Sequence, residues 1–118
     1  MRSSDIFIVI PRMKLVVYNN INFKIGENAE DNWKIIQSAN KDYYWVHAEG
    51  VSSAHIIIEI DIALEDEIKF ACIKCKEVSK NVKDTTKYVV TQIKNIKLGS
   101  KPGEVYFKDD KQCKYYTI

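Results

Sequence analysis

The sequence predicts an α+β fold: a mostly antiparallel sheet with two helices packed on it. Three observations lead to this prediction. Segments rich in β-branched residues alternate with two amphipathic segments along the 118-residue chain. Neighbouring strands are separated by turns short enough for hairpins. The chain length also lies in the range of about 100–150 residues that is usual for one domain. We therefore expect residues 1–118 to form a single domain.

The N-terminal part of the sequence predicts strands joined by a tight turn. Residues 5–10 and 14–18 are rich in β-branched side chains, which favour extended backbone. Asn19 and Asn20 tolerate left-handed backbone, so we expect the strand that ends before them to pair with residues 21–25. Gly26 then ends the hairpin.

Two helices are expected. The first runs from Asn28, a candidate N-cap, to about Ala39. The second covers residues 65–80, with acidic residues in its first turn and Lys80 near its end, as the helix dipole favours. Each has an apolar stripe at helical spacing. The stripes consist of Ala29, Trp33 and Ile36 in the first helix, and Ile68, Ala71, Cys72, Cys75 and Val78 in the second.

Between the helices, residues 43–48 and 55–60 predict a second hairpin. If this hairpin is centred on Val51, His47 and His55 lie opposite each other, and cross-strand neighbours on one face are about 4.5–5.5 Å apart at Cβ. Alternation along the first strand puts Trp45 and His47 on one face, with Tyr44 and Val46 on the other. The second helix is followed by predicted short strands at 87–93, 104–107 and 112–116, the last two joined through Asp109 and Asp110.

Composition excludes several classes of protein. The longest apolar runs, residues 6–10 and 56–58, are far shorter than the roughly 18 residues that cross a bilayer. Pro11 and Arg12 directly follow the first run, so a secretory signal is not expected. Three cysteines are an odd number, which argues against a disulfide framework and favours a reducing compartment such as the cytoplasm.

Charge is distributed unevenly along the chain. The formal net charge is +2. Residues 1–68 have six basic and eleven acidic side chains, a balance of −5, whereas residues 69–118 have twelve basic and five acidic, a balance of +7. Such an asymmetry predicts a surface that attracts a polyanion on one side. The alternative is that these lysines only solvate the surface.

Two constellations could support chemistry at a metal or a nucleophile. Cys72 and Cys75 form a C-x-x-C that could join His47 and His55 as zinc ligands. Both cysteines belong to the apolar stripe, however, where a free thiol behaves as a small hydrophobe. A Ser52 or Ser53–His55–Asp42 triad can also be drawn, but no glycine-rich elbow accompanies it. We therefore expect neither a metal site nor catalysis.

A nucleic-acid surface fits the second hairpin better. Aromatic rings stack on bases, imidazoles and hydroxyls contact phosphates or base edges, and lysines supply electrostatic attraction. Trp45, His47, Ser53 and His55 provide such groups in one segment. The alternative is that Trp45 belongs to the core and the histidines satisfy buried hydrogen bonds.

The sequence also resembles the NFACT-R domain family from about residue 15 to the C-terminus. The family pattern is approximately G-R-N-A-x-x-N, D-x-W-F-H-A-x-G-x-P-G-S-H-V, a helix with a late serine, and K-P-G-x-V. The matching residues are Gly26, Asn28, Ala29, Asn32, Trp45, His47, Gly50, His55, Ser79, Lys101, Pro102, Gly103 and Val105, with Thr91, Lys94, Asn95 and Lys97 similar to the intervening strand. Two positions depart from the pattern: Tyr43 replaces the aspartate, and Ser52-Ser53-Ala54-His55 replaces P-G-S-H, as in the standalone eukaryotic coiled-coil members.

The resemblance implies a non-catalytic RNA-binding module without cofactor or metal, in a ribosomal or transfer-RNA context close to ribosome-associated quality control. One standalone relative senses DNA, so a DNA-binding module is an alternative, as is a protein-interaction adaptor that docks on an acidic partner. The expected nucleic-acid-binding residues are Trp45, His47, Ser53, His55, Lys94, Lys97 and Lys101.

Overall fold

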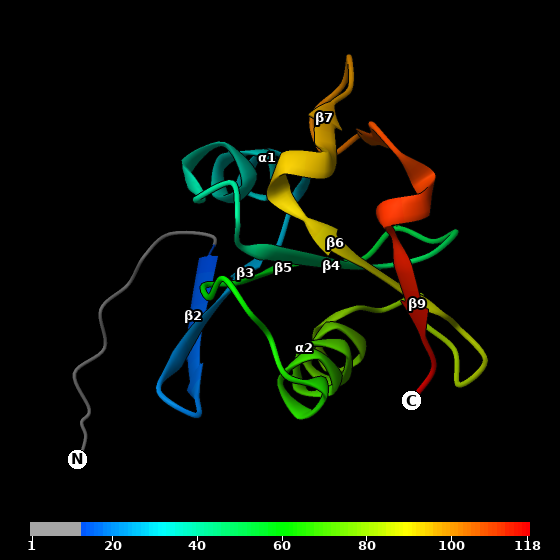
Figure 1. Ribbon diagram of the computed structural model, residues 1–118. Helices are drawn as coiled ribbons and strands as arrows, with labels where there is room; N and C mark the ends of the chain where they lie inside the picture. Colours follow the sequence, from blue (N-terminus) through cyan, green and yellow to red (C-terminus); the bar gives the residue numbers. More distant parts are fainter. Residues whose placement is uncertain (1–12) are drawn as a thin grey trace.

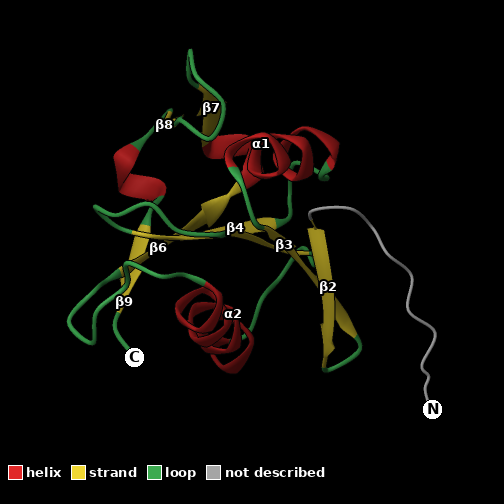
Figure 2. Ribbon diagram, turned by 180° about the vertical axis from the view of Figure 1, so that it is seen from behind, coloured by secondary structure: helices red, strands yellow, loops and turns green. Residues whose placement is uncertain are grey.

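The central element of the computed structural model, which describes residues 13–118, is a six-stranded antiparallel sheet in the order β2-β3-β5-β4-β6-β9 (Figure 1). Helix α1 and a small β7–β8 sheet lie on one side of it and α2 lies on the other (Figure 2). The expected α+β fold is therefore confirmed. The strands are β2 (Met13–Tyr18), β3 (Ile21–Gly26), β4 (Tyr44–Ala48), β5 (His55–Ile58), β6 (Tyr88–Gln92), β7 (Ile96–Leu98), β8 (Val105–Phe107) and β9 (Lys114–Tyr116), and the helices are α1 (Ala29–Ser38) and α2 (Glu65–Val78).

The β2–β3 hairpin forms where its turn residues predict it. Asn19 and Asn20 have φ angles of 53° and 61°, the left-handed conformations that a two-residue hairpin turn requires. The strand expected at residues 5–10 lies outside the described residues. The buried face of α1 differs from the expected stripe, because Ala29 is exposed and Trp33 only half-buried. The residues that α1 buries are Asp31, Asn32, Ile35 and Ile36.

The β4–β5 hairpin has the register expected for a centre at Val51. Trp45 pairs with Ile57 and Val46 with Ile56, so continuation of this register sets His47 opposite His55. The two imidazole centroids are 4.5 Å apart. The cross-strand histidine pair is therefore confirmed.

Side-chain alternation divides the core into two clusters. On the α2 side, Val46 and Ile56 pack with the helix stripe of Ala71, Cys72 and Cys75, all fully buried. On the α1 side, a smaller cluster is built around Trp45 and Ile57; its other buried members are Ile35, Ile36, Val89, Ile93 and Ile96. The sheet is thus covered on both faces, and its alternate residues enter different environments.

The C-terminal strands pair differently from the prediction. Val105–Phe107 was expected to form a hairpin with the last strand, but β8 pairs with β7 and β9 pairs with β6. The reason is the Asn95 side chain, which donates to the Asp109 carbonyl at 2.9 Å and accepts the Asp109 N–H at 2.9 Å. These bonds hold Asp109, which follows β8, against Asn95, which precedes β7. The 3₁₀ turn at Asp110–Gln112 then directs the chain to β6, where β9 pairs.

Within residues 13–118, none of the helices combines the length and the apolar character that crossing a membrane requires.

Candidate functional site

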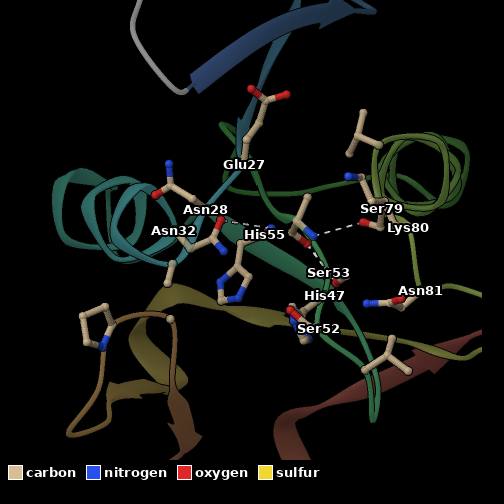
Figure 3. Close-up of a pocket in the computed structure, with 16 residues that line it drawn as sticks. Glu27, Asn28, Asn32, His47, Ser52, Ser53, His55, Ser79, Lys80 and Asn81 are labelled. Carbon is tan, nitrogen blue, oxygen red and sulfur yellow. Dashed lines mark hydrogen bonds between the residues drawn. The ribbon is translucent and has the colours of Figure 1, made fainter.

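A polar pocket of about 470 Å³ opens at the end of the central strands β4 and β5, beside the N-terminus of α1 (Figure 3). Four segments far apart in the sequence line it. They are the start of α1 with Asn28 and Asn32, the β4–β5 hairpin, the end of α2 with Ser79 and Lys80, and the β7–β8 loop with Gly103. His47, Ser53 and His55 come from the hairpin.

Trp45, His47 and His55 form a contiguous aromatic cluster at this pocket. His47 stacks on Trp45 with ring centroids 5.5 Å apart, and His55 meets both rings edge to face. Trp45 Nε1 donates to His55 Nδ1 at 3.1 Å, so a neutral His55 has its proton on Nε2. Trp45 is only 1% exposed and His55 2%. The structure thus places Trp45 in the core, where its ring cannot stack on a base.

Burial keeps both imidazoles neutral near pH 7. It lowers the pKa of His47 to about 4 and that of His55 to about 3, with a smaller contribution to His55 from His47. The pair therefore offers hydrogen-bond donors and acceptors to a ligand rather than positive charge.

Asn32 connects α1 to the hairpin. Its Oδ1 accepts the His55 backbone N–H at 3.3 Å, which leaves the two Nδ2 hydrogens on the opposite side of the amide. Gly26, which pairs with His55 across the sheet, makes room for this amide. A Cβ on Gly26 would lie only 2.2 Å from Asn32 Oδ1. The glycine therefore permits the close approach that places Asn32 at the pocket.

The β7–β8 loop packs against the start of α1. Gly103 has a φ of +87°, and a Cβ there would lie 3.1 Å from the Ala29 Cβ. Trp33 Nε1 donates to the Glu104 carbonyl at 3.0 Å, which holds the same loop to the helix. Asn28 caps the helix by accepting the Asp31 N–H at 2.9 Å. These contacts bring Gly103 to the pocket wall opposite α2.

Serine hydroxyls hold the hairpin turn in place. Ser53 Oγ accepts the Ala48 N–H at 3.1 Å and donates to the Ala54 carbonyl at 3.1 Å. Ser79 Oγ accepts the Ala54 N–H at 3.0 Å, which ties the turn to the end of α2. The Ser53 hydroxyl is thus engaged with the backbone of its own hairpin.

The residues considered for a catalytic triad do not come together. Asp42 forms an ion pair with Lys94 at 3.2 Å. This pair lies just before the start of β4, whereas His47 lies near the other end of that strand. His55 Nδ1, which an orienting carboxylate would need to contact, accepts from Trp45 instead.

The structure also separates the thiols from the imidazoles. Cys72 and Cys75 are in the α2-side core. Burial, and to a smaller extent the neighbouring Cys75 thiol, raises the pKa of Cys72 to about 12. His55 adjoins Trp45 in the cluster on the other side. No group of three or more potential metal ligands occurs in the part of the chain that the structure describes.

The three expected lysines do not form one patch. Lys101 directly precedes Pro102 and Gly103 at the pocket wall. Lys97 projects from β7 opposite Tyr106, on the exposed side of the small sheet. Lys94 lines a different hollow, at the opposite end of the β4–β6 pair. Of the three, only Lys101 is followed directly in sequence by residues that line the histidine pocket.

Sequence reasoning did not assign Asn32, Ser79, Lys80 or Gly103 to the site, yet all four line the pocket. A signal for three of them was present, because Asn32, Ser79 and Gly103 belong to the segments that resemble the NFACT-R pattern. Lys80 has no such signal and was identified only as a helix-terminal charge.

No model of a known protein family matches this chain, and no curated protein matches it. Among solved structures, the fold is similar to the C-terminal part of the fibronectin/fibrinogen-binding protein from Streptococcus suis, with a TM-score of 0.76 and 20% sequence identity. The similarity covers 99% of this chain and 48% of that one, so this domain spans about half of that structure. At this level of identity the likeness concerns the fold.

Proposed function

We propose that this domain is a non-catalytic nucleic-acid-binding module that prefers RNA. One observation carries the proposal: the segments that resemble the NFACT-R family, distant in sequence, supply the walls of a single pocket. Asn32, His47, His55, Ser79 and Gly103 all line it. Membership of that family is part of the same proposal.

The charges around the pocket allow a polyanionic ligand at its rim, because Glu27, the one acidic residue among the described residues that line the pocket, is paired with Lys14 at 3.1 Å. Lys80 lines the pocket, and Lys101 is exposed next to Pro102 in the facing loop. Lysines on two sides of an opening attract phosphates, whereas the neutral imidazoles add hydrogen bonds without charge. Lys97 extends the basic surface along β7. Lys94 lies outside this surface, because it lines the hollow at the other end of the β4–β6 pair, and it is paired with Asp42.

The electrostatic part of the proposal is tested by a salt titration of RNA binding. We expect Lys80→Glu and Lys101→Glu each to weaken binding and to lower the slope of log K against log salt by about 1. The matched control is Lys111→Glu, an exposed lysine of the C-terminal 3₁₀ turn. Equal effects of all three substitutions, or no salt dependence in the wild-type protein, would contradict the proposed surface.

A second candidate is a protein-interaction module. It is favoured by the name of the Streptococcus suis protein, which describes binding to fibronectin and fibrinogen. A pull-down from lysate with and without nuclease separates the two candidates: loss of partners after nuclease treatment supports the RNA proposal, and their retention favours a protein partner. A DNA arm with the same sequence as the RNA probe tests the preference for RNA.

We propose that the module acts in the cytoplasm on ribosomal or transfer RNA. The three cysteines are free, which agrees with a reducing compartment. Crosslinking followed by sequencing of the bound nucleic acid tests this assignment, because ribosomal, transfer and unrelated RNA give different read distributions.

A further inference from the structure

The floor of the histidine pocket presents hydrogen-bond donors from two buried residues. Asn32 is 5% exposed and His55 2%, and both side chains line the pocket. Asn32 uses Oδ1 for the His55 N–H, and His55 uses Nδ1 for Trp45. Asn32 Nδ2 and His55 Nε2 have no hydrogen-bond partner within residues 13–118. Figure 3 shows the two side chains next to each other in the pocket.

Such groups are available to a ligand, because a donor that faces a pocket without a protein partner bonds to water that a ligand can replace. Strands β4 and β3 hold these donors in place: Trp45 of β4 fixes the His55 tautomer, and Gly26 of β3 gives the Asn32 amide its position. The donors are therefore built into the fold.

The charges of the pocket disfavour a phosphate on this floor. Glu30 and Asp31 occupy the first turn of α1, where an anion would otherwise be attracted, and both histidines are neutral at pH 7. Lys80 is the one basic residue among those that line the pocket. A neutral ligand with hydrogen-bond acceptors fits this environment, and its charged part fits the rim near Lys80 and Lys101.

The size agrees with such a ligand. A volume of about 470 Å³ lies within the range of roughly 300–1,000 Å³ that is usual for small-molecule sites. A planar base would lie between the polar floor and the loop of Pro102 and Gly103. Two neighbouring donors suit a base edge with adjacent acceptors, such as O2 and N3 of cytosine.

We infer that this pocket takes the base of one unpaired nucleotide, while the adjoining phosphates meet Lys80 and Lys101. The inference rests on the proposed RNA-binding function and specifies its substrate class: RNA with a single-stranded segment, rather than continuous duplex. An unpaired base enters the pocket without the cost of a few kcal/mol that extrusion from a duplex requires.

The test uses one RNA hairpin with three different ends: blunt, with a tail of four cytosines, and with a tail of four abasic nucleotides. The abasic tail keeps the phosphates and removes the bases. We expect the cytosine tail to bind about tenfold more tightly than the abasic tail, a difference of about 1.4 kcal/mol. One cytosine N3 should also become protected from dimethyl sulfate.

Ser52→Trp blocks the pocket without disturbing the core, because Ser52 is exposed at the pocket mouth. The matched control is Ser38→Trp, an exposed position at the opposite end of α1. We expect Ser52→Trp to abolish both the preference for the cytosine tail and the protection, and Ser38→Trp to preserve them.

The outcomes separate this inference from the proposed function. Equal binding of the cytosine and abasic tails, with salt-dependent binding of all three RNAs, overturns the base-binding pocket and leaves the RNA-binding function in place. An unchanged preference in Ser52→Trp overturns the assignment of the base to this pocket. Failure of every RNA to bind overturns both.

Discussion

The two faces of the sheet differ in the side chains that the same strands place on them. In β4, Val46 packs in the apolar core on the α2 side. Trp45 and His47 of the same strand lie on the α1 side, where the polar pocket opens. Strand β5 does the same with Ile56 and His55. The α2 face therefore supplies stability through apolar packing, and the α1 face carries hydrogen bonds that packing must support. Substitutions on the two faces should consequently have different effects.

The largest effect is expected on the α2 face. Phe23 is fully buried there, so Phe23→Ala should lower the free energy of unfolding by about 3–5 kcal/mol through lost burial and a cavity. Urea unfolding measures this loss. Under conditions where the variant remains folded, its affinity for tailed RNA should equal that of the wild type. A specific loss of the cytosine-tail preference would show that the two faces are not separable.

The α1 face should make stability depend on pH. His47 and His55 have pKa values lowered by burial to about 4 and about 3, whereas the unfolded chain binds protons near the ordinary value of about 6.5. The unfolded state therefore binds more protons at pH 5, and stability should fall as pH decreases from about 6.5 by up to about 1.4 kcal/mol per pH unit for each histidine. Unfolding in urea at pH 7, 6 and 5 measures this slope.

His47→Asn provides the comparison for that experiment. It removes one of the two titrating groups at a half-buried position, so the slope between pH 6 and pH 5 should fall to about half, since each histidine contributes the same limiting value. An unchanged slope in the variant would mean that His47 is not held neutral by the fold.

A smaller effect is expected from the bond that orients His55. Trp45→Phe removes the Nε1–H that donates to His55 Nδ1 and keeps most of the apolar ring. The unpartnered Nδ1 should cost about 1–3 kcal/mol of stability. In ¹⁵N spectra, the wild-type imidazole should have its proton on Nε2, and the variant should show a mixture of tautomers. The same tautomer in both proteins would contradict the orienting role of Trp45.

The smallest effect is expected where α2 meets the pocket. Ser79→Ala removes the hydroxyl that accepts the Ala54 N–H, at an expected cost of about 1 kcal/mol. Ser100→Ala, in an exposed loop, is the control and should cost less, because water can replace its contacts. We expect Ser79→Ala to leave the cytosine-tail preference unaffected, because Ser53 still holds the hairpin turn. A reduced preference would show that the hairpin turn and the pocket are coupled.

Local chemistry made much of the fold predictable. Asn19 and Asn20 specify the first turn, Asn28 caps α1, and a hairpin centre assumed at Val51 predicts the register that sets His47 opposite His55. Each depends on residues close in sequence. The partners of β8 were predicted wrongly, because the Asn95–Asp109 hydrogen bonds join residues that no local pattern relates.

The site was predictable only in part for the same reason. The sequence singled out the correct hairpin but assigned Trp45 to a contact surface, as one of two interpretations, whereas it is buried beneath His47 and His55. The lysines were grouped by their place in the C-terminal half, and folding divided them: Lys101 adjoins the pocket and Lys94 pairs with Asp42 at the other end of the sheet.

Periodicity and turn chemistry within short segments predicted the class of fold, the Asn19-Asn20 turn and the Asn28 cap. They also predicted that the histidines lie opposite each other, on the assumption of a hairpin centre at Val51. The composition of the pocket, in contrast, depends on the three-dimensional fold. Asn32, Ser79 and Gly103 meet the histidines only through contacts between distant segments, and burial by those segments makes the imidazoles neutral. A balance of −5 against +7 along the chain could not reveal this, because charge in sequence says nothing of which side chains folding brings together.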